Sequence, residues 1–244
     1  MVIGRGPSLT EQVTAHLKTQ IADGVYEEGR IPSETELASD LGVSRTTIRD
    51  ALSRLEHEGA IYRRQGSGTF VNPQGLQIRS RLEEIWAYEQ VLRDHGYTPS
   101  VKVLSLHAGK ASDADADALE IAIGAPLLVM GKLFLEDDEP VVLTSNRIPA
   151  ALLPNDVDAT DAVAPIYEFL ERHAGLKLAY YLSDLVPTAL DSEQAALLGV
   201  EAGTPALSFE EVGYDGEARP IVKAESYFRD DLVRFRLMRR RTPA

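Results

Sequence analysis

Hydrophobic residues in the first third of the chain recur at helical spacing. The first apolar stripe consists of Leu9, Val13, Leu17 and Ile21. Because residues four apart lie on one face of a helix, this stripe predicts an amphipathic helix, and Gly24 is a typical helix stop.

Two more helices follow, and their first residues carry capping signals. Ser33 and Glu36 form a capping-box pattern, in which each side chain satisfies a backbone N–H group that has no partner inside the helix. Ser44 can cap a third helix. The apolar side of that third helix consists of Ile48, Ala51, Leu52 and Leu55.

The spacing between the second and third helices predicts a helix-turn-helix. Ala38 is small enough to let the two helices approach closely, and Gly42 can adopt the positive φ angle of a tight turn. Residues 61–64 and 69–71 then read as two strands around the glycine-rich turn 65–68. A helix-turn-helix followed by a hairpin is a winged helix.

The third helix carries the candidate DNA-reading chemistry. In this motif the N-terminal end of the second helix of the pair enters the major groove. Here that end presents Arg45, Thr46, Thr47 and Arg49. An alternative is that the arginines form a solvated helix face and pair with Asp50. Residues 45–64 contain five cations against three acids, which favours DNA binding.

The remaining two thirds of the chain contain an internal repeat. Residues 118–140 can be laid on residues 197–220 with an offset of 79, which becomes 80 after a turn. Each copy reads as a short helix, a Gly-x-Pro break, a strand, a turn and a second strand, so the two copies predict one antiparallel sheet with related halves. A helix over 166–173 and a strand over 176–186 are expected between them, and helical segments from Leu82 to near Gly96 before them.

Composition narrows the class of protein. The chain is 44% hydrophobic and 26% charged, and it has no cysteine, which excludes disulfides and thiolate chemistry and favours the cytoplasm. No segment is long and apolar enough for a membrane span or a signal peptide. The five histidines lack metal-ligand spacing, so we expect neither a metal nor a cofactor.

The net charge of −13 argues against nucleic-acid binding only at first sight. Residues 1–75 carry a net charge of −2, whereas residues 76–244 carry −11. The acidity therefore belongs to the second part of the chain and does not exclude DNA binding by the first.

The N-terminal motifs resemble a known family. The segments 32–38 (PSETELA), 42–49 (GVSRTTIR) and 65–71 (QGSGTFV) closely resemble the DNA-binding domain of GntR-type bacterial transcription regulators, over about residues 9–71. The resemblance implies base or phosphate contacts by the arginines and threonines of the third helix, and a minor-groove contact at Gly66. The DNA-binding residues that it predicts are Ser33, Thr35, Ser44, Arg45, Thr46, Thr47, Arg49, Gln65, Gly66 and Ser67. Many members have Arg where this chain has Thr35, so one phosphate or base contact is expected to be missing or replaced.

The C-terminal part resembles, more weakly, the UTRA effector domain of the HutC-like GntR branch over roughly residues 82–238. That domain shares its fold with chorismate lyase, and the resemblance implies a homodimer and a ligand pocket in the sheet domain. The predicted fold class is α+β: a winged helix-turn-helix (residues 1–71), a linker (72–81) and a UTRA-type, chorismate-lyase-like antiparallel-sheet domain (82–244).

The pocket of sugar-phosphate-sensing relatives uses two arginines, a glutamate and a serine, and the aligned positions here hold Lys132, Phe134, Thr144 and Pro165. Without the two arginines of these relatives, the pocket has no guanidinium group to bind a phosphate in bidentate geometry. We therefore predict a less anionic, partly apolar effector that is not a sugar phosphate. The candidate lining residues are Tyr88, Glu89, Lys132, Phe134, Thr144, Glu225 and Tyr227. In the alternative interpretation Phe134 is core, Lys132 is an exposed strand residue and Tyr227 packs between sheet and helix.

These observations predict a sequence-specific DNA-binding transcription regulator, with repression favoured, whose affinity for double-stranded operator DNA is modulated by a small-molecule metabolite. No catalytic residue is expected. Two alternatives stay open. One is a DNA-binding scaffold with a vestigial pocket, and the other is a chorismate-lyase-like enzyme with a general acid at Glu225 or Glu211.

Overall fold

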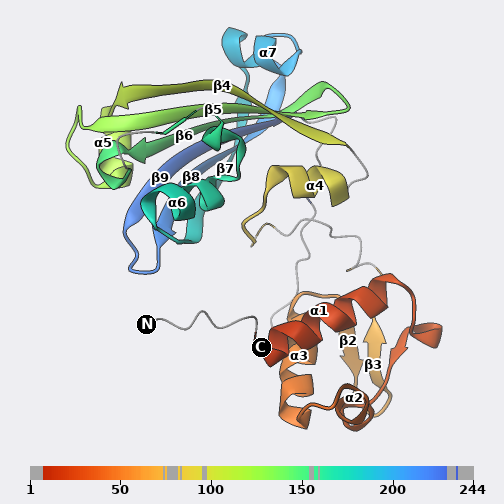
Figure 1. Cartoon of the computed structure of the whole chain (residues 1–244). Helices are drawn as coiled ribbons and strands as arrows, with labels where there is room; N and C mark the ends of the chain where they lie inside the picture. The colour runs from red at the N-terminus through yellow and green to blue at the C-terminus, as the bar shows by residue number, and fades with distance from the viewer. Residues whose placement is uncertain are drawn as a thin grey trace. The chain divides into compact units, whose positions relative to one another are not determined.

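The computed structural model describes residues 8–73, 75, 82, 84–94, 98–153, 157–158, 160–229 and 235. The chain divides into an N-terminal unit and a second unit, Leu82–Phe235 (Figure 1). Gly96 and residues 76–81, which belong to the predicted helix end and linker, lie outside the described residues. Among the described residues no helix is long and apolar enough to cross a membrane.

The N-terminal unit is the winged helix-turn-helix predicted from the sequence. Its elements in chain order are α1 (Leu9–Ala22), β1 (Arg30–Ile31), α2 (Glu34–Leu41), α3 (Arg45–His57), β2 (Ile61–Arg64) and β3 (Gly68–Val71). The three strands form an antiparallel sheet in the order β1-β3-β2. Strand β1 has only two residues and was not anticipated, because so short a strand has no readable alternation.

Local signals position the helices of this unit. The Ser33 side chain accepts from the backbone N–H of Glu36, and the Glu36 carboxylate accepts from the Ser33 N–H, as the capping box requires. Gly42 ends α2 with a φ of 63°, which is the left-handed conformation that glycine adopts most easily. Ile48, Leu52 and Leu55 of α3 are buried in the core against α1. The helix-turn-helix prediction is confirmed.

The start of the predicted linker is bound to this unit. The Asn72 side chain donates to the Gly59 carbonyl at 2.8 Å, and the Asn72 backbone N–H donates to the Ala60 carbonyl at 2.8 Å. Asn72 therefore continues the wing strand rather than beginning a free connection.

The second unit is built on one six-stranded antiparallel sheet in the order β4-β5-β6-β9-β8-β7. Its strands are β4 (Pro99–Lys110), β5 (Pro126–Glu136), β6 (Glu139–Pro149), β7 (Leu178–Ala189), β8 (Pro205–Asp215) and β9 (Pro220–Arg229). Its helices are α4 (Tyr88–Asp94), α5 (Asp113–Leu119), α6 (Ile166–Ala174) and α7 (Ser192–Leu198), with short 3₁₀ turns at Ala150–Leu152 and Asp161–Val163. The α+β class is confirmed.

The internal repeat is longer than the sequence pattern revealed. The two copies are β4-α5-β5-β6 and β7-α7-β8-β9, and β4, which the sequence pattern did not predict, starts the first copy. Equivalent backbone hydrogen bonds recur at the same offset: Ala111 N–H donates to Ala125 O, and Leu190 N–H donates to Thr204 O. Since β6 pairs with β9 at the centre of the sheet, the halves are related by an approximate two-fold axis between these strands.

The helices cover the two faces of the sheet differently. Helices α4 and α6 lie on one side, and α7 lies on the other (Figure 1). On the first side, α6 buries Phe169 and Leu170 in a cluster with Met130 and Val222 of the sheet. On the second side, α7 packs Leu198 against Leu133 and Leu143. The described residues just before α4 and its first turn line the cavity on the first side.

Candidate DNA-binding surface and effector cavity

Helix α3 presents an exposed polar face at its N-terminus. Arg45, Thr46 and Arg49 are exposed and Thr47 is half-buried, while Ile48 beside them is fully buried. The Ser44 hydroxyl accepts from the Thr47 N–H at 3.1 Å and so begins the helix at Arg45. The partial positive charge at the N-terminus of the helix adds to the charge of the two guanidinium groups. This surface is therefore suited to contact phosphate groups and base edges.

The two arginines of this face have no ion-pair partner among the described residues, unlike Arg54 and Arg63 of the same unit. Arg54 pairs with Glu11 at 3.9 Å, and Arg63 pairs with Glu56 at 3.3 Å, whereas no ion pair joins Arg45 or Arg49 to a described acid. The alternative pairing with Asp50 is therefore not what the structure has. Two cations without partners are available to a polyanion.

The remaining predicted DNA-binding residues lie around this helix. Ser33 and Thr35 lie at the start of α2, and the wing tip exposes Gln65, Gly66 and Ser67. Gly66 has a φ of 74°, which the tight hairpin between β2 and β3 requires. All ten predicted residues thus lie on the winged-helix unit outside its buried core, although the structure contains no DNA.

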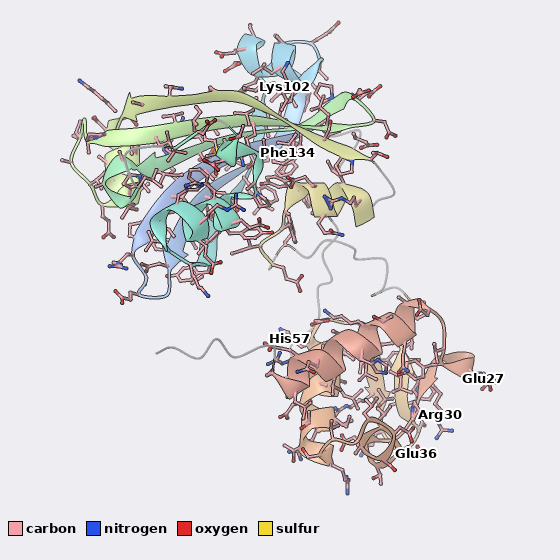
Figure 2. All side chains as sticks on the ribbon, in the orientation of Figure 1. Glu27, Arg30, Glu36, His57, Lys102 and Phe134 are labelled. Atoms are coloured by element: carbon pink, nitrogen blue, oxygen red, sulfur yellow. The ribbon has the colours of Figure 1, made fainter. Side chains whose placement is uncertain are left out.

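A cavity of about 390 Å³ lies on the α4–α6 side of the second unit. It is bounded by the sheet, by α4 and the residues just before it, and by the start of α6. Of the residues predicted to bind an effector, those that line the cavity are Tyr88, Glu89, Lys132, Phe134 and Thr144. Phe134 lies between the sheet and α4 (Figure 2), where its ring and that of Tyr88 pack in a T-shaped arrangement with centroids 5.0 Å apart.

Glu225 and Tyr227 do not line the cavity, contrary to the expectation from the sequence. Their neighbours Ala224 and Ser226 do. Because side chains of a strand alternate between the two faces, an odd-numbered residue of β9 must point away from the side that Ser226 faces. The sequence prediction was right that β9 lines the cavity, but it was wrong about which face of the strand, and so which residues, point toward it.

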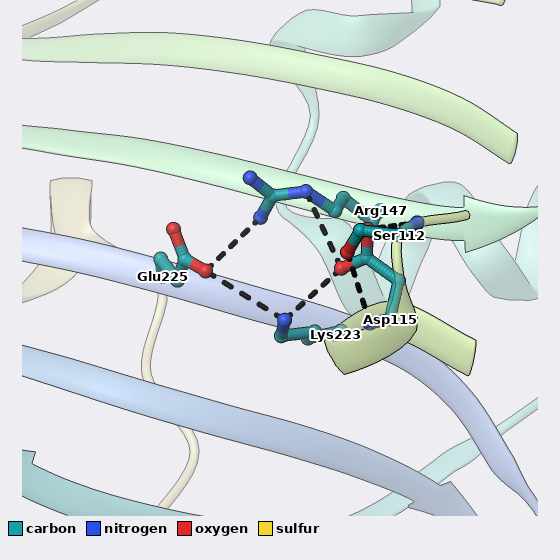
Figure 3. Close-up of polar contacts among 5 residues, drawn as sticks. All are labelled: Ser112, Asp115, Arg147, Lys223 and Glu225. Atoms are coloured by element: carbon teal, nitrogen blue, oxygen red, sulfur yellow. Dashed lines mark hydrogen bonds and ion pairs between the residues drawn. The ribbon is translucent and has the colours of Figure 1, made fainter. Parts of the chain in front are cut away.

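On that opposite face Glu225 belongs to an ion-pair cluster (Figure 3). Arg147 contacts Glu225 at 3.3 Å and Asp115 at 3.6 Å, and Lys223 contacts Asp115 at 3.0 Å. Burial acts to raise the pKa of Asp115, but hydrogen bonds from Ser112 and Lys223 hold it below its usual value. The cluster joins α5 of the first repeat to β9 of the second.

Tyr227 packs on the α7 side in the cluster of Leu198 and Leu133, as the alternative interpretation had it. Its position is equivalent to that of Arg147 in the first repeat, and Gln194 of α7 is equivalent to Asp115. A hydrogen bond from the Gln194 side chain acts on the pKa of Tyr227, although burial raises it overall. One copy thus joins helix to strand by an ion pair, and the other uses a neutral pair.

Several cavity residues were missed by the sequence prediction. The polar ones are Glu84, Asn146, Ser183, Glu211 and Ser226, and the aromatic ones include Trp86, Tyr181 and Phe209. Glu211 was expected only as a candidate general acid. The repeat itself held the missing signal, because an offset of 79 from Lys132 leads to Glu211.

In the cavity, the pKa values of Lys132 and Glu211 are shifted toward the neutral forms of these residues. Burial lowers the pKa of Lys132 to about 8, partly offset by Glu89, and its ammonium donates to the Ala164 carbonyl at 2.5 Å. Burial also raises the pKa of Glu211, against a hydrogen bond from Ser183. The pKa of Tyr88 is raised by burial and by Glu211, and its hydroxyl donates to Ser226 at 2.9 Å.

Three polar atoms at the cavity are buried without a hydrogen-bond partner among the described residues. They are Trp86 Nε1, Glu89 Oε2 and Thr144 Oγ1. Thr144 is only 3% exposed. A buried polar atom without a partner is destabilising, and a ligand or water with matching groups removes that penalty. Within the described part of the chain, no group of three His, Asp or Glu side chains is arranged to hold a metal ion.

Comparison with known proteins agrees with this arrangement. Residues 9–71 match the family model described as bacterial regulatory proteins, gntR family, and residues 94–234 match the UTRA domain. The HTH-type transcriptional repressor NagR of Bacillus subtilis is 28% identical over 92% of this chain and 91% of that protein. The HTH-type transcriptional repressor PhnF of Mycolicibacterium smegmatis is 30% identical over 96% of this chain and 95% of that protein.

Solved structures share the fold. The crystal structure of a possible transcriptional regulator, YydK from Bacillus subtilis, covers 95% of this chain and 99% of its own, with a TM-score of 0.74 and 22% identity. That of PhnF from Mycobacterium smegmatis covers 94% of this chain and all of its own, with a TM-score of 0.60 and 27% identity.

A winged helix with exposed arginines, joined in one chain to a sheet domain with a cavity, defines the class of ligand-responsive DNA-binding transcription regulators. Within that class, the chain belongs to the GntR family of bacterial regulatory proteins and carries a UTRA effector-binding domain. Both resemblances inferred from the sequence are confirmed.

Proposed function

We propose that this regulator acts as a homodimeric repressor in the cytoplasm. In this proposal paired α3 helices read a two-fold operator with half-sites about one helical turn, roughly 34–36 Å, apart. Binding of a small molecule in the cavity stabilises a state in which the two winged-helix units of the dimer no longer have the spacing of the half-sites. The observation that carries the proposal is the exposure of Arg45 and Arg49 at the N-terminus of α3, where neither has an ion-pair partner among the described residues.

Each DNA contact has a physical role in this proposal. Arg49 and Arg45 donate bidentate hydrogen bonds to guanine edges or to phosphates. Thr46 and Thr47, the Ser33 and Thr35 side chains and the wing tip 65–67 contact the phosphate backbone and fix the orientation of the helix. Since phosphate contacts release counterions, binding should weaken steeply as salt rises.

A homodimer is supported by the edge of the sheet. Strand β7 lies at one end of the strand order, so one side of it has no strand partner within the described sheet. Leu182 on β7 is 68% exposed, and Tyr180 and Leu185 are also exposed. A long edge strand with exposed apolar side chains is the kind of surface that a second copy covers.

The proposed effector is a molecule other than a sugar phosphate. The cavity holds one ammonium, Lys132, and no guanidinium among its described lining residues, while aromatic rings make up much of its wall. A single ammonium group cannot form the bidentate hydrogen bonds by which arginine binds phosphate. We do not propose a catalytic role. Of the two residues considered as a general acid, Glu225 lies on the sheet face away from the cavity, and the relatives are transcription regulators.

The test uses the full-length chain and DNA from upstream of its own gene. Footprinting should show a protected two-fold site, and sedimentation should show a dimer in the complex. A metabolite that raises the melting temperature of the protein should also release the DNA, because a ligand that binds one native state stabilises it by mass action. A folded protein that ignores this DNA at low ionic strength would contradict the proposal.

A further inference from the structure

The two charged residues on the floor of the cavity occupy equivalent positions of the repeat. Lys132 on β5 and Glu211 on β8 are related by the offset of 79. Register confirms the equivalence: Lys132 lies in one cross-strand row with Thr144 and Ser226, and Glu211 lies in the next row with Ala224. The approximate two-fold axis that relates the shapes of the two halves therefore relates opposite charges.

These charges are too far apart to neutralise one another. Strands β6 and β9 lie between β5 and β8, which places three strand spacings, or about 14 Å, between the backbones of Lys132 and Glu211. Among the described residues, no cation lies within ion-pair distance of Glu211, and its hydrogen-bond partner is the Ser183 hydroxyl. The β8 end of the cavity is thus an unpaired acidic end.

The β5 end is different because an acid faces the base there. Glu89 of α4 acts electrostatically on Lys132, although the two are not within ion-pair distance. Counting the interior side chains, two carboxylates oppose one ammonium, and Glu84 adds an exposed carboxylate at the rim. A ligand with a positive charge is favoured over an anion by this balance.

Neutral groups between the two ends complete the pattern. Thr144 Oγ1 and Trp86 Nε1 are buried without a hydrogen-bond partner among the described residues, and the Trp86 ring packs beside Phe209 of β8. Tyr181 and Phe209 line the cavity near Glu211, and aromatic faces attract organic cations. The site therefore offers the acceptor Glu211 at the β8 end and the donor Lys132, with Thr144 beside it, at the β5 end, while aromatic rings line the wall along its length.

We propose that the cavity binds a small organic amine or guanidine, whose cationic nitrogen donates to Glu211 and whose far end carries a hydrogen-bond acceptor for Lys132 and Thr144. This inference rests on the proposed function, in which the cavity is the effector site. It narrows the effector from a partly apolar molecule to one with a cationic end, an apolar middle and an accepting end.

Three probes with one skeleton test the charge preference. Tyramine carries an ammonium and a phenol oxygen, tyrosol replaces the ammonium with a hydroxyl, and 4-hydroxyphenylacetate replaces it with a carboxylate. Calorimetry on the full-length protein should rank tyramine about ten-fold or more above tyrosol, as one charge-assisted hydrogen bond allows, and tyrosol above 4-hydroxyphenylacetate.

Variants of β8 connect that preference to one side chain. Glu211→Gln should reduce the tyramine-to-tyrosol ratio to about one, since the neutral amide keeps the shape but not the charge, whereas Glu211→Asp should keep the ranking. Glu210→Gln is the matched control, because Glu210 is the adjacent, exposed carboxylate on the same strand. Melting temperatures of all variants show whether each protein is folded.

The outcomes separate the inference from the proposed function. If wild-type protein binds its promoter DNA but ignores tyramine, prefers the carboxylate probe, or keeps its preference in folded Glu211→Gln, the ligand class is wrong and the regulator stands. If the protein binds tyramine as expected but no promoter DNA, the proposed function fails and the ligand class stands.

Discussion

The DNA-binding surface and the effector cavity use charge in opposite ways. Arg45 and Arg49 are exposed, so water solvates them until a polyanion arrives. Lys132 is buried and Glu211 is half-buried, and burial shifts the pKa of each toward its neutral form. An exposed cation keeps its hydration shell and therefore has no desolvation cost before DNA binds, whereas a buried charge is stabilised only when its partner is present. The first arrangement suits a general electrostatic attraction, and the second suits a choice among ligands.

The largest expected effect concerns the exposed side of this comparison. Arg45→Ala and Arg49→Ala should each weaken operator binding by about 1–3 kcal/mol, and removing one phosphate-binding cation should lower the salt slope by about one. Fluorescence anisotropy with promoter DNA at several salt concentrations measures both. Arg54→Ala is the control, because Arg54 lies on the same helix but already pairs with Glu11. An equal weakening in Arg54→Ala would mean that these cations act only through overall charge.

The next prediction tests the rule that buried charges need partners. Asp115→Asn should destabilise the protein by about 1–3 kcal/mol at neutral pH, because Lys223 and Arg147 lose a charged acceptor. The folded-state pKa of Asp115 is lowered, so its contribution is present above the unfolded pKa and is lost as pH falls through the folded value. Urea denaturation between pH 7 and pH 3 measures it.

Asp113→Asn is the control for that experiment, since Asp113 is exposed in the same helical turn. A gap between Asp115→Asn and wild type that persists below the folded pKa of Asp115 would show that packing, not charge, is responsible.

A smaller effect is expected from the wing, where backbone conformation rather than charge is at stake. Gly66→Ala should destabilise the folded head by about 1–2 kcal/mol, because alanine is strained at a φ of 74° although its methyl group meets no atom. Gly216→Ala in the β8–β9 turn also has open space, and its φ lies outside the left-handed region, so it should be nearly neutral. Chemical denaturation compares the two, and equal destabilisation would exclude strain as the cause.

The smallest effect at neutral pH is predicted for the buried base. Lys132→Met should change stability by no more than about 1 kcal/mol at pH 7, since the absence of the hydrogen bond to Ala164 is offset by the removal of a buried ammonium. Its signature is in the pH dependence. The folded pKa of about 8 lies below the ordinary 10.5, so the unfolded chain binds more protons between these values and wild-type stability rises there with pH.

Lys132→Met should flatten that rise while leaving operator binding without effector unchanged. Thermal melts from pH 7 to pH 10 check the first point and anisotropy checks the second. Parallel curves for variant and wild type would show that Lys132 is not buried as described.

The same contrast governs how far each site could be predicted. The winged-helix unit is specified by local signals, which are the capping box of Ser33 and Glu36, the cap Ser44 and the helix-ending Gly42. Each acts within one or two helical turns, so the start or end of each helix can be predicted from the order of residues. The cavity depends on which face of a strand a residue occupies. A shift of one position along a strand moves a side chain to the opposite face. For this reason the prediction chose the right strand for Glu225 and Tyr227 but placed their side chains on the wrong face of the sheet.

The strand β4 illustrates a second limit. It begins the first repeat, yet its burial pattern is mostly intermediate, and the sequence pattern placed the start of the repeat at the helix after it. Pairing with β5 over its full length, rather than a strong alternation of its own, makes it a strand. Its partner in the second copy, β7, was expected, and the offset of 79 would have located β4 from it.

The sequence alone determined the family, the winged helix with its exposed arginines, and the repeated helix-strand-strand order, because caps, turns and periodicity act between near neighbours in the chain. Tertiary structure decided which charges meet and which stay apart. Only the folded sheet joins Asp115 to Lys223 across 108 positions, and only it separates Lys132 from Glu211 by two strands. Electrostatic energy depends on distance and burial in space, and neither is written in the order of residues.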